Sequence, residues 1–127
     1  MSITRLAALP GETTMLYRIA AVDERGRVAE RSVIHALGWG PGERLQFGLI
    51  SNTAIAVQPD SGGVFSLARR SHLPIPVTAR RWCGLQTGDR VLLAAAPDHG
   101  VLVVYTMRAL DTMVMAFRAS AGGGEVS

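Results

Sequence analysis

The sequence predicts a mainly β, α+β domain built from two copies of one small unit. Three observations support this prediction: a degenerate internal repeat, short apolar runs separated by turn residues, and only two short helical patterns before a longer one near the end of the chain. The chain has 127 residues, of which 48% are apolar, so it can bury one compact core. We therefore expect a single domain.

The internal repeat needs no gap between residues 37 and 105 when the sequence is shifted by about 46 positions. Leu37-Gly38-Trp39 then falls on Cys83-Gly84-Leu85, and Gly42-Glu43-Arg44-Leu45 falls on Gly88-Asp89-Arg90-Val91. A unit of this length cannot bury its apolar face alone, so the two copies are expected to complete each other's core. Repeat one spans residues 17–59 and repeat two spans 63–105.

Repeat one reads as strand, strand, helix, strand, strand. An apolar run at 17–22 meets the turn Asp23-Glu24-Arg25-Gly26, and 27–29 returns as the second strand of a hairpin. Apolar residues recur at helical spacing over 30–37, with Glu30 or Ser32 at the start and Gly38 just past the end. Alternation at 45–50 and again at 55–57, across a turn at 51–53, predicts the last two strands.

Repeat two follows the same order after a linker at 60–63, which is too short to separate two domains. Its predicted elements are strands at 64–68 and 73–75, a helix at 76–83, and strands at 90–96 and 101–105.

The two ends of the chain lie outside the repeats. Residues 1–16 are expected to form a poorly ordered arm. Thr106 can cap a helix over 106–118 whose apolar face is Leu110, Met113, Val114 and Phe117. This face must either dock on its own body or pair with the same helix of a second chain to form a homodimer. The glycine-rich residues 119–127 are expected to be a disordered tail.

The charges are distributed unevenly. All thirteen basic residues are arginines, the net charge is +3, and the stretch between Arg69 and Arg81 carries four arginines and a histidine without a carboxylate. Such a balance favours a polyanionic partner, although single arginines in loops can also be solvated charges that keep a β-rich protein soluble. Codon bias would explain the absence of lysine but not this clustering. No apolar run reaches the roughly 18 residues of a membrane span, so we expect a cytoplasmic protein without a membrane partner.

Enzyme chemistry has little support in the sequence. Cys83 stands where repeat one has Leu37, so it is expected in the core. The three histidines, His35, His72 and His99, lie far apart in the sequence and lack neighbours at metal-ligand spacing. We expect no catalytic site, no metal and no cofactor. The two tryptophans, Trp39 and Trp82, adjoin the helix ends and are expected to pack in the core or a groove.

The order of these motifs carries a family resemblance. Val22-Asp23-Glu24-Arg25-Gly26-Arg27-Val28, a short helix and Pro41-Gly42-Glu43-Arg44-Leu45 resemble the AbrB/MazE/SpoVT (SpoVT-AbrB domain) family of bacterial DNA-binding proteins. In repeat two, Leu73-Pro74-Ile75-Pro76, the helix with Arg80 and Arg81, and Thr87-Gly88-Asp89-Arg90-Val91 resemble the rest of the family pattern. The resemblance covers residues 17–105 and implies a swapped-hairpin AbrB-type β-barrel. In tandem, MraZ-like members of the family, one chain supplies both halves.

The resemblance also implies a function: sequence-specific binding of double-stranded DNA by a cytoplasmic, nucleoid-associated transcriptional regulator. In the family, arginines of the first hairpin tip and of the helix meet the DNA, which here points to Arg27, Arg80 and Arg81. Repeat one has Ile34 and His35 at the paired-arginine positions, so a strictly palindromic site is not expected. The full candidate set for DNA binding is Arg25, Arg27, Arg31, His35, Arg69, Arg70, His72, Arg80 and Arg81.

Among these candidates we expect Arg80 and Arg81 to contribute most. They are expected early in a helix that follows Pro76, where helix-end amides and side chains can meet phosphate together. Repeat one instead has Glu24 and Glu30 close to its basic residues.

A second hypothesis comes from the end of the chain. An amphipathic segment followed by a flexible tail can fold on a partner, so the chain can also be interpreted as an antitoxin-like module that neutralises a toxin through its C-terminal segment.

Overall fold

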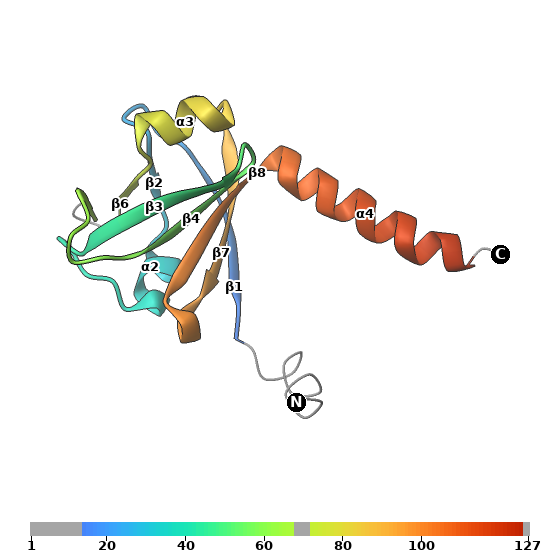
Figure 1. Ribbon diagram of the computed structural model, residues 1–127, viewed down its shortest axis with the longest axis horizontal. Helices are drawn as coiled ribbons and strands as arrows, with labels where there is room; N and C mark the ends of the chain where they lie inside the picture. The colour runs from blue at the N-terminus through green and yellow to red at the C-terminus, as the bar shows by residue number, and fades with distance from the viewer. Residues whose placement is uncertain (1–13, 68–71, 126–127) are drawn as a thin grey trace.

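The computed structural model describes residues 14–67 and 72–125, which form an α+β fold with antiparallel sheets (Figure 1). The predicted order of elements is present in both copies. Repeat one contains β1 (Leu16–Ala21), β2 (Arg27–Ala29), α2 (Arg31–Leu37), β3 (Arg44–Ser51) and β4 (Ala54–Pro59). Repeat two contains β5 (Phe65–Ser66), β6 (His72–Pro74), α3 (Val77–Cys83), β7 (Arg90–Ala96) and β8 (Val101–Thr106), with a 3₁₀ turn η2 (Pro97–His99) between β7 and β8. The chain continues into α4 (Met107–Glu125).

The strands of one copy pair mainly with strands of the other. A six-stranded sheet has the order β1-β7-β8-β4-β3-β5, and a two-stranded sheet consists of β2 and β6. The first strand of each copy thus lies against the third strand of the other, as β1 with β7 and β5 with β3. The fourth strands, β4 and β8, pair with each other, as do β2 and β6. The two copies therefore interleave within one chain, which is why neither has a core of its own.

The interleaving has an approximate two-fold symmetry. In the β2–β6 ladder Val28 faces Leu73, which is the equivalent residue of the other copy. Two equivalent pairs of backbone hydrogen bonds also tie the strand end of each copy to the glycine turn of the other. In the first pair, the Val22 amide donates to Asp89 O at 2.9 Å and the Gly88 amide donates to Val22 O at 2.8 Å. In the second pair, the Leu67 amide donates to Glu43 O and the Gly42 amide donates to Leu67 O, both at 2.9 Å. The sequence repeat is thus a structural unit used twice.

One apolar core is assembled from both copies. Its largest fully buried side chains are Leu45, Ile55, Leu73, Leu93 and Leu102, with valines between them. Cys83 belongs to this core as predicted, and burial raises the pKa of its thiol.

The short helices begin and end close to the predicted positions. Glu30 precedes α2, where its carboxylate accepts a hydrogen bond from the Ser32 amide at 3.2 Å, and Gly38 ends the helix with φ of 75°, a conformation that glycine adopts without strain. Trp39 is buried as expected, but Trp82 is 59% exposed. The prediction for Trp82 was wrong because Ala79 and Cys83 form the buried face of α3 and leave Trp82 on another side of the helix.

The terminal helix is longer than predicted. The Thr106 hydroxyl accepts a hydrogen bond from the Ala109 amide at 3.2 Å, as expected of a cap, but α4 continues to Glu125. The expected helix end at residue 118, and with it a disordered tail from 119, is therefore wrong up to residue 125. Alanines at 116, 119 and 121 favour helix, and a glycine costs only about 1 kcal/mol in a helix. Within the described residues, no helix is long and apolar enough to cross a membrane.

Candidate functional site

Asp23 builds the turn of the β1–β2 hairpin. Its Oδ1 accepts hydrogen bonds from the amides of Arg25 and Arg27, both at 2.8 Å, and its Oδ2 lies 3.3 Å from Arg27 Nε in an ion pair. The Arg27 amide, the Arg25 amide and the Arg27 charge hold the pKa of Asp23 below its ordinary value. The turn also contains Gly26, whose φ of 74° favours glycine. Asp23 thus fixes the backbone from which Arg25 projects into solvent.

Helix α3 of repeat two lies against this turn, at the same end of the molecule (Figure 1). Arg80 Nε donates a hydrogen bond to Ile75 O at 2.9 Å, and the Ile75 amide donates one to Gly26 O at 3.0 Å. The guanidinium of Arg80 covers Gly26 so closely that a Cβ on this glycine would lie 2.4 Å from Arg80 Cζ. Arg80 therefore joins α3 to the turn of the first hairpin, across the boundary between the repeats.

The structure thereby gathers four of the predicted residues, Arg25, Arg27, Arg80 and Arg81, which we call the hairpin–α3 cluster. Arg25 and Arg81 are exposed, whereas Arg27 and Arg80 are half-buried. Among the described residues the only ion pair is that of Arg27 with Asp23. Three of the four arginines therefore have no carboxylate partner in the described part of the chain.

A second group of predicted residues surrounds α2. Arg31 and His35 line a hollow of about 520 Å³ together with Ser32 and Trp39, and both are exposed. His72 is half-buried on β6, where it pairs with Ala29 just before α2. Arg69 and Arg70 lie outside the described residues.

The α2 group lies opposite the hairpin–α3 cluster. Because β2 and β6 are antiparallel and each leads into its own helix, α2 and α3 stand at opposite ends of this ladder (Figure 1). The two ends differ in chemistry: the position equivalent to Arg80 is Ile34, which is buried, and that equivalent to Arg81 is His35.

The structure corrects the expected position of Arg80 and Arg81 within their helix. α3 begins at Val77 and has seven residues, so both arginines fall in its last turn, before Gly84. Cations are favourable at this end because it carries the negative pole of the helix dipole. The helix-end amides therefore cannot assist these residues, and any contact with phosphate must come from the side chains.

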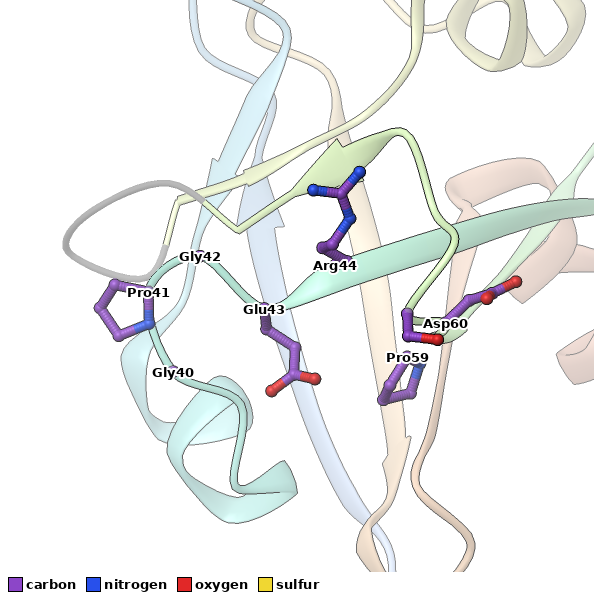
Figure 2. A pocket seen from close by; sticks show the side chains of 8 residues that line it. Gly40, Pro41, Gly42, Glu43, Arg44, Pro59 and Asp60 are labelled. Atoms are coloured by element: carbon purple, nitrogen blue, oxygen red, sulfur yellow. The ribbon is translucent and has the colours of Figure 1, made fainter.

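Another hollow of about 520 Å³ lies beside the linker, between the turn at Gly40–Arg44 and the end of β4 (Figure 2). Its polar groups do not converge. Arg44 points away from Glu43 and donates a hydrogen bond from Nε to Gly63 O at 3.0 Å, while Asp60 Oδ1 accepts one from the Gly62 amide at 2.9 Å. These groups hold the linker in place. The described residues contain no group of three or more His, Cys, Asp or Glu side chains that could hold a metal ion.

Sequence reasoning missed the positioning roles of Asp23 and Gly26. The Asp-x-x-Gly pattern of a turn was a local signal for both residues. The contact of Gly26 with Arg80 had no such signal, because these residues belong to different repeats.

Replacing Gly26 by alanine is expected to be more destabilising than replacing Gly38 by alanine. Both glycines have φ near 75°, so each alanine would have the same backbone strain, about 1–2 kcal/mol. Only at Gly26 would the new methyl collide with the guanidinium of Arg80, since no atom lies within 4 Å of the corresponding point at Gly38. Urea denaturation of the two variants measures the difference.

The same pair can be compared in an Arg80→Ala background. There the penalties at Gly26 and Gly38 are expected to become equal. An unchanged excess at Gly26 would contradict the placement of Arg80 over the hairpin turn.

No family model, curated protein or solved structure matches this chain.

Proposed function

We propose that this protein binds double-stranded DNA in a sequence-specific manner and regulates transcription, using the hairpin–α3 cluster as its main contact surface. The observation that carries the proposal is the contact of the Arg80 guanidinium with Gly26. This contact brings arginines of both repeats to one end of the molecule, where only Arg27 is neutralised by an ion pair among the described residues. Phosphate contacts dominate the affinity of proteins for DNA.

The members of the cluster have different roles in this proposal. Arg25 and Arg81 are exposed and have no ion-pair partner among the described residues. The positive charge of each can neutralise a phosphate, or its planar guanidinium can donate hydrogen bonds to guanine O6 and N7 together in the major groove. Arg80 is the positioning residue that holds the hairpin turn against α3. Arg27 is restrained by Asp23 and contributes less.

We further propose that the two sheets close into a swapped-hairpin barrel. At one edge of the six-stranded sheet, an isolated bridge between Val22 and Val28 joins the end of β1 to β2. At the other edge, β5 contacts β6. This arrangement supports closure through the β2–β6 ladder. The α2 group then provides the second half of the DNA surface, with His35 where the first half has Arg81, so the preferred site is asymmetric.

Binding is expected to weaken steeply with salt, because each neutralised phosphate releases condensed counterions. The test is a fluorescence-anisotropy titration with labelled duplexes, including one from the promoter region of the gene that encodes this chain, starting at about 50 mM salt. Binding with a strong salt dependence, and a preference over an unrelated competitor duplex, is the expected outcome. Absence of binding to any duplex at micromolar protein would contradict the proposal.

The exposed apolar side chains of α4 favour a second candidate, an antitoxin-like module. Met113, Val114 and Phe117 are all exposed, as a segment that awaits a partner would require. This candidate predicts that a toxin-like protein encoded beside this chain binds it, and that Phe117→Ala weakens that complex without changing DNA affinity. An isolated gene would count against it.

A further inference from the structure

Beyond its first turn, α4 projects away from the body of its own chain (Figure 1). Its first turn rests on the body: Ala109 is buried, and Arg108 Nη2 donates hydrogen bonds to Asn52 O and Cys83 O, both at 3.4 Å. From Asp111 to Ala121 every residue is exposed, and Figure 1 shows the helix projecting away from the sheets. Phe117 is 73% exposed, so a large aromatic side chain remains in water.

Four apolar residues of α4, among them the exposed Val114 and Phe117, follow the spacing of a two-helix seam. Leu110, Val114, Phe117 and Ala121 recur at alternating intervals of four and three residues, the spacing of the a and d positions of a coiled coil. The seam begins at Leu110, which is half-buried against the body, and continues past the point where the body ends. An apolar stripe of this kind is stable in water when another helix covers it.

The residues beside the seam indicate which helix fits. One flank carries Asp111 and Arg118, and the other carries Met113 and Ser120. Asp111 and Arg118 are two turns apart on one helix, too far to pair with each other, and neither makes an ion pair with the described residues. Both charges are thus available to a partner helix.

We infer that a second copy of this chain covers α4 by packing its own α4 in the antiparallel direction. A two-fold axis then places Val114 beside Phe117 of the second copy, and Leu110 beside Ala121 of that copy. In an antiparallel pair like flanks face each other, so Asp111 meets Arg118 of the other copy twice, once on each side of the axis. In a parallel pair both charges would face the flank of Met113 and Ser120. This inference does not depend on DNA binding.

The first experiment compares variants of the seam with a variant outside it, in the full-length chain. Sedimentation equilibrium of the wild-type chain is expected to give a concentration-dependent mass approaching twice the chain mass of 13.5 kDa. Val114→Glu is expected to remain a single chain at every concentration. Met115→Glu is the matched control, since Met115 is also an exposed apolar residue of α4 but is not one of the four seam residues, and it is expected to dimerise like the wild type. Circular dichroism checks that α4 remains helical.

The second experiment tests the direction of pairing by charge reversal. Asp111→Arg and Arg118→Asp are each expected to weaken dimerisation about tenfold, because each turns two attractive contacts into repulsive ones. The double variant is expected to regain the wild-type affinity. In a parallel pair, by contrast, neither single variant would lose affinity, because both charges would face the uncharged Met113 and Ser120. A wild-type chain that stays monomeric, equal effects of Val114→Glu and Met115→Glu, or a double variant no better than the single ones would each overturn the inference. The inference would also be overturned if the chain stayed monomeric and its α4 bound a different protein or a lipid surface.

Discussion

Replacing Gly63 by alanine is expected to lower the free energy of unfolding by about 3 kcal/mol. The Cβ of the new residue would lie 2.3 Å from Leu45 O and 2.8 Å from Leu45 C. Both atoms belong to the backbone of β3, which is paired with β4 on one side and with β5 on the other, so they cannot move aside as the end of a flexible side chain could. The linker must then leave its place against the strand.

That movement would also break hydrogen bonds. The Gly63 amide donates to Asp60 O at 2.8 Å, and its carbonyl accepts from Arg44 Nε at 3.0 Å. Gly62→Ala is the control, because the nearest atom to its Cβ is Asp60 Oδ1 at 3.6 Å, an ordinary contact. Urea denaturation of both variants is the measurement. If Gly63→Ala proved as stable as Gly62→Ala, the linker would not pack on β3 as described.

The second large effect concerns DNA. Arg80→Ala combined with Arg81→Ala is expected to weaken binding by at least about 2 kcal/mol, roughly thirtyfold, which corresponds to one bidentate base contact plus a phosphate contact. This loss is expected to exceed that of Arg25→Ala combined with Arg27→Ala at the same salt concentration. The reason is that Arg27 is already paired with Asp23, whereas removal of Arg80 also releases the hairpin turn that presents Arg25.

Lysine substitutions separate the two roles proposed for the α3 arginines. Arg80→Lys keeps the charge but loses the Nε hydrogen bond to Ile75 O and the planar contact with Gly26, so its DNA affinity is expected to approach that of Arg80→Ala. Arg81→Lys keeps the charge, and the Arg81 side chain makes no hydrogen bond or ion pair with the described residues, so this variant is expected to retain more of the affinity. Circular dichroism of each variant is the folding control. Among the alanine variants, a larger loss of DNA affinity for Arg25→Ala combined with Arg27→Ala than for Arg80→Ala combined with Arg81→Ala would mean that the first hairpin recognises DNA by itself.

The order of the elements could be predicted because its signals are local. Turn residues such as those at 23–26 and alternating apolar residues identified most strands to within a residue or two, and β7 at Arg90–Ala96 was predicted with both ends correct. Gly38 marked the end of the first helix, and its positive φ is the conformation that glycine favours there. The internal repeat also predicted that the two copies share one core.

The remaining features depend on contacts between residues far apart in the sequence. The contact of Arg80 with Gly26 joins the two repeats, so it cannot be derived from the sequence of either repeat alone. The exposure of Trp82 depends on which face of α3 meets the core, and a helix of two turns leaves that open in the sequence. The end of α4 was misplaced because the glycines that suggested a tail are only a weak obstacle to a helix.

If the hairpin–α3 cluster meets DNA phosphates, its exposed arginines must contribute to the salt dependence of binding. Anisotropy titrations of one duplex at a series of salt concentrations give the slope of log K against log salt for the wild type, for Arg25→Ala combined with Arg81→Ala, and for Arg18→Ala. Arg18 lies on the edge strand β1, is exposed and serves as the control. The double variant is expected to have a slope shallower by about two, one for each lost phosphate contact, and Arg18→Ala a slope equal to that of the wild type. Equal slopes for all three proteins would mean that Arg25 and Arg81 do not meet DNA phosphates.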